Sequence, residues 1–349
     1  MVLLLERCTE FHIPVWACSL DFRKAFDTVE HSSLWQALLS QEVPALYVRV
    51  LAALYSKQTG QVIGRSMSKT FELGRGTKQG DPLSPALFNA LLEYVLGPLQ
   101  VEWRAKSWGI SLGSDPLDVL CTLRFADDMI ILARSRCQLK QMLHDLLRRI
   151  VELGVEVHAG KSKVLCNVLT SRSLQTLKVD NHSFDIVPMA RGTMYLGRML
   201  SFGQLHDAEV SNRMSRAWAK FNAHRKELCN KHFHLSHRLR FFQAVITPSA
   251  LYSAGTWTMT AGRERILRSM QRKMLRIIVN VRRTTVSSGD STSSSTDDED
   301  EDCEEDDESH LEPWLLWMSR ATSLSEEMAQ KHGICDWVED QRRRKWRLA

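Results

Sequence analysis

The chain has 349 residues and a mass of 40.0 kDa, enough for one large domain or two to three smaller ones. Hydrophobic residues make up 44% and charged residues 25%, which is ordinary for a soluble globular protein. No apolar run reaches the roughly 18 residues of a membrane span. The opening apolar stretch ends at Glu6, too early for a signal peptide, so membrane insertion and secretion are disfavoured.

The net charge of +5 is unevenly distributed along the chain. Residues 297–308 are twelve positions with eleven acidic residues, interrupted by Cys303. Without this tract, 46 basic residues face 41 − 11 = 30 acidic residues, a net charge of +16. Such a basic balance fits a polyanionic partner, nucleic acid before any other.

Residues 1–200 mix strand and helix patterns, which predicts an α+β domain. Strands are predicted at 15–20, 117–125, 129–133, 164–168, 174–179 and 184–187. Helices are predicted at 32–39, 45–55, 82–103 and 139–153. Weak alternation around Gly64 over residues 58–71 predicts a hairpin between the second and third helices.

Beyond His206 the pattern becomes helical and rich in Arg and Lys, over 208–230, 235–246 and 263–281. Residues 287–309 are Ser/Thr-rich and then acidic, and we expect a disordered linker because they can bury little apolar area. The expected organisation has four parts: 1–200, a helical basic region at 201–285, a linker at 286–310, and a small helical basic tail at 311–349.

Asp21 follows directly on the apolar run of residues 15–20. A carboxylate at the end of a buried strand is costly unless its charge has a partner, and a metal ion is one such partner. A helix cap for the following segment is an equally good interpretation of this residue alone.

Asp127 and Asp128 are adjacent and lie between two apolar runs. If those runs pair as a hairpin, both acids lie at its tip, where like charges repel and favour a cation. A solvated Asp-Asp turn is the alternative. Together with Asp21, the pair suggests three carboxylates that bind two Mg²⁺ ions, or Mn²⁺ in their place, about 3.5–4 Å apart for phosphoryl or nucleotidyl transfer.

A glycine-rich loop at residues 75–85 leads into the helix predicted at 82–103. Two glycines allow close backbone approach, and a helix N-terminus suits phosphates or a base-paired backbone. An ordinary loop before a helix remains the alternative.

These motifs resemble the palm of a reverse transcriptase of the non-LTR (LINE-type) retrotransposons. In chain order the segments similar to polymerase motifs A to E are 21–27, 78–85, 125–128, 154–163 and 195–197. The resemblance implies an antiparallel palm sheet with packed helices and partial fingers, followed by an all-helical thumb. It also implies an RNA template, a DNA primer and dNTPs as partners.

Carried over by position, Asp21 and Asp127 would bind both metal ions, with Asp128 as a third carboxylate. Phe26 would be the steric gate that excludes a 2′-hydroxyl, unless it is a plain core residue. Lys161 would protonate the leaving pyrophosphate, although Lys163 competes and an exposed lysine is more often solvated.

The remaining roles that the resemblance implies concern binding. Contacts to the incoming nucleotide and template fall on Gln79, Gly80, Phe125 and Ala126. The primer end would be held by Tyr195, Leu196 and Gly197. The nucleic-acid backbone would meet Arg213, Arg216, Lys220 and Arg238, for which a solvated helical face is the alternative. The tryptophans of the tail are expected to pack a small helical hairpin.

The resemblance predicts an RNA-directed DNA polymerase of a LINE-type element that extends a primer 3′-OH. Two departures bear on it: His158 stands where the family has Asn, and only about twenty residues precede Asp21, so the fingers and an endonuclease are expected to be missing. We therefore interpret the chain as a fragment or decayed copy. A non-catalytic nucleic-acid-binding remnant and an intron maturase-like protein are the alternatives.

Eight cysteines show no spacing typical of a zinc site, which favours reduced thiols and a nuclear or cytoplasmic location. Nuclear location is expected from where such elements insert, not from a sequence signal. No membrane partner is expected.

Overall fold

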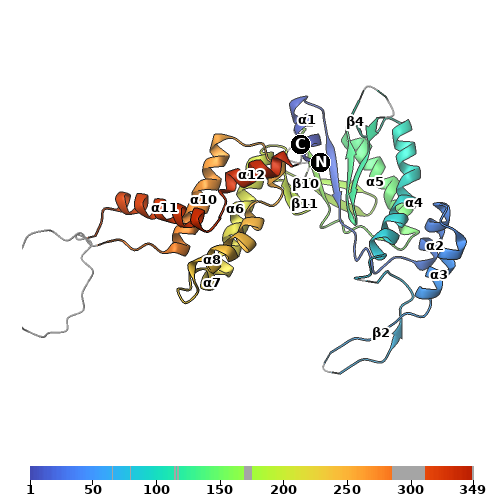
Figure 1. Cartoon of the computed structure of the whole chain (residues 1–349). Helices are drawn as coiled ribbons and strands as arrows, with labels where there is room; N and C mark the ends of the chain where they lie inside the picture. Colours follow the sequence, from blue (N-terminus) through green and yellow to red (C-terminus); the bar gives the residue numbers. More distant parts are fainter. Residues whose placement is uncertain are drawn as a thin grey trace, which may run out of the picture. The chain divides into compact units, whose positions relative to one another are not determined.

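The computed structural model describes residues 1–64, 66–78, 80–113, 115, 118–168, 175–284 and 311–347. The contacts divide the chain into two compact units, Met1–Ala208 and Glu209–Ala349 (Figure 1). Each unit has its own hydrophobic core. The segment predicted as a linker, 286–310, lies outside the described residues.

A six-stranded sheet forms the centre of the first unit, in the order β6-β7-β1-β8-β10-β9. Its strands are β1 (Trp16–Leu20), β6 (Thr122–Phe125), β7 (Asp128–Ala133), β8 (Lys163–Cys166), β9 (Thr176–Val179) and β10 (His182–Val187). All neighbours are antiparallel except β8 and β10, which are parallel. With the helices described next, this arrangement confirms the predicted α+β class.

Helices cover one face of this sheet more heavily than the other. The helices of the unit are α1 (Val2–Glu10), α2 (His31–Ser40), α3 (Ala45–Tyr55), α4 (Ser84–Ala105) and α5 (Arg136–Val151). Alternate β1 residues point to opposite faces, so Cys18 and Leu20 pack with α2, α4 and α5, whereas Ala17 packs with α1. Burial on both faces explains why residues 15–20 are apolar apart from Ser19.

Three two-stranded ribbons complete the first unit. They pair β2 (Thr59–Gly60) with β3 (Phe71–Glu72), β4 (Ile110–Ser111) with β5 (Val119–Leu120), and β11 (Thr193–Tyr195) with β12 (Arg198–Leu200). The first of these is the hairpin expected at residues 58–71. The last packs against the sheet face that α1 also covers, through Tyr195 and Leu200.

The described residues of the second unit form helices joined by short loops, and no strand is present among them. Its helices are α6 (Leu205–Ala223), whose first turn lies in the first unit, α7 (Arg225–Cys229), α8 (Leu235–Phe241), α9 (Thr247–Ala250), α10 (Ala261–Val279), α11 (Trp314–Lys331) and α12 (Trp337–Trp346). A π-helical turn at Phe242–Ile246 joins α8 to α9, and a 3₁₀ turn follows at Ala254–Thr256. No helix among the described residues is long and apolar enough to cross a membrane.

The C-terminal helix α12 belongs to the core of the second unit. Trp337 is fully buried there, stacks on Phe242 with ring centroids 5.9 Å apart, and donates its indole N–H to Thr247 Oγ1 over 3.1 Å. The segment that we expected as a separate tail at 311–349 therefore shares a core with residues of α8 to α10. Trp314 and Trp317 contact each other on α11, with ring centroids 4.7 Å apart.

We predict that Trp337→Ala destabilises the second unit by about 3–5 kcal/mol, because it leaves a large cavity and removes a buried hydrogen bond. Trp346→Ala on the same helix is the matched control, since Trp346 is 87% exposed, and should change stability by less than about 0.5 kcal/mol. Urea unfolding followed by tryptophan fluorescence measures both. Equal effects of the two substitutions would show that α12 does not stabilise this core.

Candidate active site

Three carboxylates gather where β1 ends. Leu20 of β1 pairs with Met129 of β7, and the next residues on the two strands are Asp21 and Asp128. Phe125 pairs with Asp128, so β6 and β7 form a hairpin whose turn contains Asp127. The predicted hairpin is therefore present, with both of its acids at the tip.

The turn between β6 and β7 contains a strained backbone position. Ala126 has φ 53°, a left-handed conformation that costs a non-glycine residue about 1–2 kcal/mol. A positive φ at the first position of a two-residue connection matches the twist of the flanking strands. Strained residues of this kind cluster at functional sites, where the surrounding structure holds them in place.

Asp128 is the carboxylate whose affinity for protons is raised by its surroundings. Burial, and after it the charges of Asp127 and Asp21, raises the pKa of Asp128 above its ordinary value. Among the described residues, none of the three carboxylates forms an ion pair with a Lys or Arg side chain. Within the described part of the chain, the end of β1 is therefore a negative site without a protein counter-charge.

The donor chemistry of this site fits a hard divalent cation, since all the side-chain donors are carboxylate oxygens. No three His, Cys, Asp or Glu side chains in the described part of the chain lie close enough together to form a finished metal site. Mg²⁺ does not need a finished protein site, because it usually keeps several waters and takes one or two carboxylates plus substrate phosphates.

The backbone of Asp21 is fixed by a segment far away in sequence. Its N–H donates to Ser162 Oγ over 3.1 Å, and its carbonyl accepts from the His158 N–H over 2.7 Å. Ser162 is fully buried and donates its hydroxyl to the His158 carbonyl over 3.0 Å. The sequence analysis assigned no role to Ser162; its position between two lysines of the motif D-like segment was the available signal.

The two lysines beside Ser162 differ in their surroundings. Lys163 Nζ forms an ion pair with Asp185 over 2.6 Å and donates to the Gly160 carbonyl over 2.8 Å. Lys161 is exposed, and its backbone N–H contacts His158 Nδ1 over 3.3 Å. Of the two, Lys161 is the one whose ammonium group has no hydrogen-bond partner among the described residues.

The loop before α4 is joined to the segment after β1. Gly76 N–H donates to the Val29 carbonyl over 2.8 Å, and Thr77 N–H donates to the Phe26 carbonyl over 2.6 Å. Gly76 has φ +88°, and a Cβ there would lie 2.7 Å from the Asp27 carbonyl oxygen. These contacts join the start of the glycine-rich loop to the motif A-like segment and the residues just after it.

The outer part of the same loop faces open space. Gly80 has φ +87°, is exposed, and a Cβ added to it would meet no described atom within 4 Å. Ser84 Oγ donates to the Lys78 carbonyl over 2.5 Å and closes the loop against the start of α4. Gln79, the predicted partner of Gly80 in nucleotide contact, lies outside the described residues.

Phe26 is half-buried and packs against Phe88 of α4, with ring centroids 5.1 Å apart. This contact fixes the orientation of the Phe26 ring relative to α4, the helix that follows the glycine-rich loop. A cavity of about 820 Å³ lies between α2, α4 and the strained turn, and Phe125 and Ala126 line it. Phe125 itself is 65% exposed at the hairpin tip.

The β11–β12 ribbon lies near the carboxylates. Leu196 and Gly197 form its two-residue turn, and both have positive φ, 47° and 73°, as a type I′ turn requires. Tyr195 is buried, and burial followed by the charge of Asp128 raises the pKa of its hydroxyl. The motif E-like segment is therefore within electrostatic range of the acid cluster.

Four residues of the second unit were predicted to bind the nucleic-acid backbone. Two of them, Arg213 and Arg238, form contacts within the protein instead. Arg213 is 3% exposed, pairs with buried Glu209 over 2.6 Å and lies over the Tyr252 ring. Arg238 donates to the carbonyls of residues in α7, the following loop and α10, namely Leu228, Phe233 and Ile278. Arg216 and Lys220 are exposed on α6.

Residues 8–200 match the family model described as "Reverse transcriptase (RNA-dependent DNA polymerase)". This region includes the three carboxylates and all five motif-like segments. The chain belongs to the reverse transcriptase family.

Several relatives are Pol polyproteins of R2 retrotransposable elements. The protein from Nasonia vitripennis is 31% identical over 47% of this chain and 15% of its own length. The protein from Popillia japonica is 32% identical over 58% of this chain and 28% of its own length. These matches confirm the resemblance to non-LTR elements. The aligned region spans less than a third of either relative.

A telomerase structure from Candida tropicalis, with a fragment of telomeric RNA, is similar at 14% identity and a TM-score of 0.45. The similarity covers 80% of this chain and 42% of that chain. A second structure, apo telomerase from the same organism, is similar at 13% identity and a TM-score of 0.41, over 80% of this chain and 45% of that chain.

We predict that Gly76→Ala lowers stability by about 3 kcal/mol, since left-handed strain and a clash with the Asp27 carbonyl add together. Gly80→Ala is the matched control, because its φ is nearly the same but its surroundings are open. It should cost only about 1 kcal/mol. Urea unfolding of both variants tests whether close packing of Gly76 against Asp27 stabilises the fold. Similar losses of stability for the two glycine variants would contradict this role of Gly76.

We predict that Asp128→Asn stabilises the folded first unit by about 0.5 kcal/mol at neutral pH, because it removes a partly buried charge that is also repelled by Asp127 and Asp21. The raised pKa means that proton uptake by Asp128 stabilises the folded state. The stability that protonated Asp128 contributes to the wild type is therefore lost as the pH rises through the raised pKa. In acid, the wild type and the variant should have the same stability.

Thermal unfolding at neutral pH and near pH 4 measures this difference. Glu42→Gln removes one exposed charge at the end of α2 and serves as the control. An advantage of Asp128→Asn that persists unchanged in acid would show that the charge of Asp128 is not its cause.

Proposed function

We propose that this chain is the catalytic part of an RNA-directed DNA polymerase that transfers nucleotides from dNTPs to a primer 3′-OH on an RNA template. The observation that carries the proposal is the gathering of Asp21, Asp127 and Asp128 at the end of β1, where no described residue supplies a counter-charge. Membership of the reverse transcriptase family supports it.

In this proposal Asp21 and Asp127 hold two Mg²⁺ ions, for which Mn²⁺ can substitute, and Asp128 contributes a third carboxylate. Bound there, the ions would supply charge stabilisation for the attacking and leaving oxygens. The backbone contacts of Asp21 to Ser162 and His158 support this role, because they fix the strand end that carries the carboxylate.

Substrate contacts are proposed on the elements around the carboxylates. Phe26, oriented by Phe88, would exclude a 2′-hydroxyl from the incoming nucleotide. Gly80 offers an open backbone for the nucleotide or template. Phe125 and Ala126 line the cavity next to α4 and would contact the same ligands. We extend the nucleotide-contact proposal to Gln79, which lies outside the described residues.

Proton transfer and primer positioning complete the proposal. Lys161 would donate a proton to the leaving pyrophosphate, since Lys163 is occupied by Asp185. The turn formed by Leu196 and Gly197, next to Tyr195, would position the primer end. Arg216 and Lys220 would contact the nucleic-acid backbone.

A non-catalytic nucleic-acid-binding remnant is the second candidate. One observation favours it: no three potential metal ligands in the described residues form a finished site. Such a remnant would bind nucleic acid and fail to extend a primer with either metal ion.

Primer extension on poly(rA)/oligo(dT) with Mg²⁺ or Mn²⁺ separates the two candidates. We expect weak extension by the full chain. Asp127→Asn should lower it by about 100-fold or more, because several kcal/mol of charge stabilisation by the metals is lost. Glu42→Gln should leave it unchanged.

A second readout does not depend on turnover. Mg²⁺ should raise the unfolding temperature of the wild type more than that of Asp127→Asn, since a cation that binds only the folded state stabilises it. Robust extension that survives Asp127→Asn would contradict the polymerase assignment. Duplex binding with no extension under any metal would favour the remnant.

A further inference from the structure

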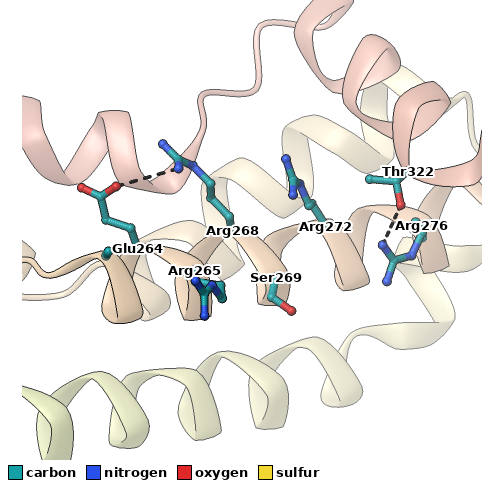
Figure 2. Close-up of a pocket in the computed structure, with 8 residues that line it drawn as sticks. Glu264, Arg265, Arg268, Ser269, Arg272, Arg276 and Thr322 are labelled. Carbon is teal, nitrogen blue, oxygen red and sulfur yellow. Dashed lines mark hydrogen bonds and ion pairs between the residues drawn. The ribbon is translucent and has the colours of Figure 1, made fainter. Parts of the chain in front are cut away.

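Helix α10 carries a row of arginines along a cavity in the second unit. Arg265, Arg268, Arg272 and Arg276 recur at intervals of three and four residues, so they lie on neighbouring positions of one side of the helix. Together with Thr322 of α11 they line a cavity of about 590 Å³ (Figure 2).

The cavity is long rather than round. Its lining begins at Ala261 and ends at Arg276, about 22 Å along the helix at 1.5 Å per residue. Arginines four positions apart are separated by about 6 Å along the axis. This spacing is of the same order as the separation of successive phosphates on a nucleic-acid strand.

The arginines are only partly neutralised by carboxylates. Arg268 contacts Glu264 and Asp336, each over 3.8 Å, and Arg272 pairs with Glu326. Exposed pairs of this kind contribute little net stability and can exchange for a stronger ligand. Arg265 is exposed and has no ion pair among the described residues.

The guanidinium groups also repel one another. Arg276 Nη1 donates to Thr322 Oγ1 over 2.9 Å. Burial, and after it the charge of Arg272, lowers the pKa of Arg276, while Glu326 acts in the opposite direction. A row of cations held this close together on one helix is favourable for an extended anion.

We propose that the groove between α10 and α11 binds the sugar-phosphate backbone of a nucleic-acid strand. Arginine is suited to phosphate because its planar fork donates two parallel hydrogen bonds. None of the described residues that line the groove is aromatic, so base stacking is not part of the binding and sequence preference should be weak.

The charge distribution supports a polyanion over a small anion. Residues 209–284 and 311–347 contain 23 Lys and Arg against 9 Asp and Glu, whereas residues 1–208 contain 23 against 20. The described residues that line the groove are separate from those of the carboxylate site. The inference therefore goes beyond the proposed polymerase activity and holds even if the chain cannot extend a primer.

The test is the binding of a fluorescein-labelled 20-nucleotide RNA of mixed sequence to the full chain, followed by anisotropy at several salt concentrations. The double variant Arg265→Gln/Arg272→Gln should bind about tenfold more weakly. Its slope of log K against log salt should fall by about 1.4, about 0.7 for each phosphate on the single strand that is no longer neutralised. The matched control is Lys140→Gln/Arg148→Gln on α5, which removes the same charge from exposed positions.

The control should change affinity less than about twofold and leave the salt slope unaltered. Equal losses in the two double variants would overturn the proposal, because only total charge would then matter. The anisotropy assay measures binding without turnover, so a failed primer-extension assay does not decide this test. Stronger competition by polyglutamate than by unlabelled RNA would assign the groove to an acidic peptide and overturn the proposal.

Glu326→Gln provides a test of opposite sign that does not depend on removing arginines. It frees Arg272 from its carboxylate partner and should raise affinity for the RNA about threefold. Unchanged or weaker binding by a folded Glu326→Gln protein would contradict the assignment of Arg272 to phosphate.

Discussion

The position of β1 between β7 and β8 is the constraint on which the site depends. Both neighbours are antiparallel, and their registers set Leu20 opposite Met129 and Ser19 opposite Lys163. Because alternate residues of a strand point to opposite faces, a shift of one position would move every β1 side chain to the wrong core. Buried packing on both faces excludes such a shift, and the end of the strand is thereby fixed.

Holding acids at this strand end has an electrostatic cost that the described part of the chain does not relieve. The cations on the neighbouring strands are used elsewhere, since Arg124 pairs with Glu93 and Lys163 pairs with Asp185. Burial, followed by repulsion from Asp127 and Asp21, raises the pKa of Asp128. A local arrangement that lowers stability without an internal compensation is typical of a functional site.

Local patterns were enough to predict the elements that carry the acids. The apolar run before Asp21 predicts a strand, and two apolar runs around Asp127 predict a hairpin, because strand period and turn chemistry are local properties. The contact of Asp21 with Ser162 joins residues 141 positions apart. Nothing in the neighbourhood of either residue specifies such a partner.

The same difference between local patterns and long-range contacts explains why the roles of the arginines in the second unit could not be predicted from the sequence. From the sequence alone, an arginine in a helix can equally well face solvent, pair with a carboxylate or bind phosphate. The packing of the neighbouring helices decides which of these it does. Arg238 donates hydrogen bonds to carbonyls of three segments, and Arg213 is buried in an ion pair with Glu209. Tertiary packing therefore engages both side chains within the protein. The part of the site that depends on long-range contacts was therefore not predictable from spacing.

The distribution of charge between the two units is consistent with keeping the three carboxylates un-neutralised. Cations placed around the three carboxylates would neutralise them and compete with any metal ion. Residues 1–208 are nearly balanced, and the basic excess lies instead on residues 209–284 and 311–347. Attraction for a polyanion can then be strong without neutralising the acids, because the two requirements are met by different helices and strands.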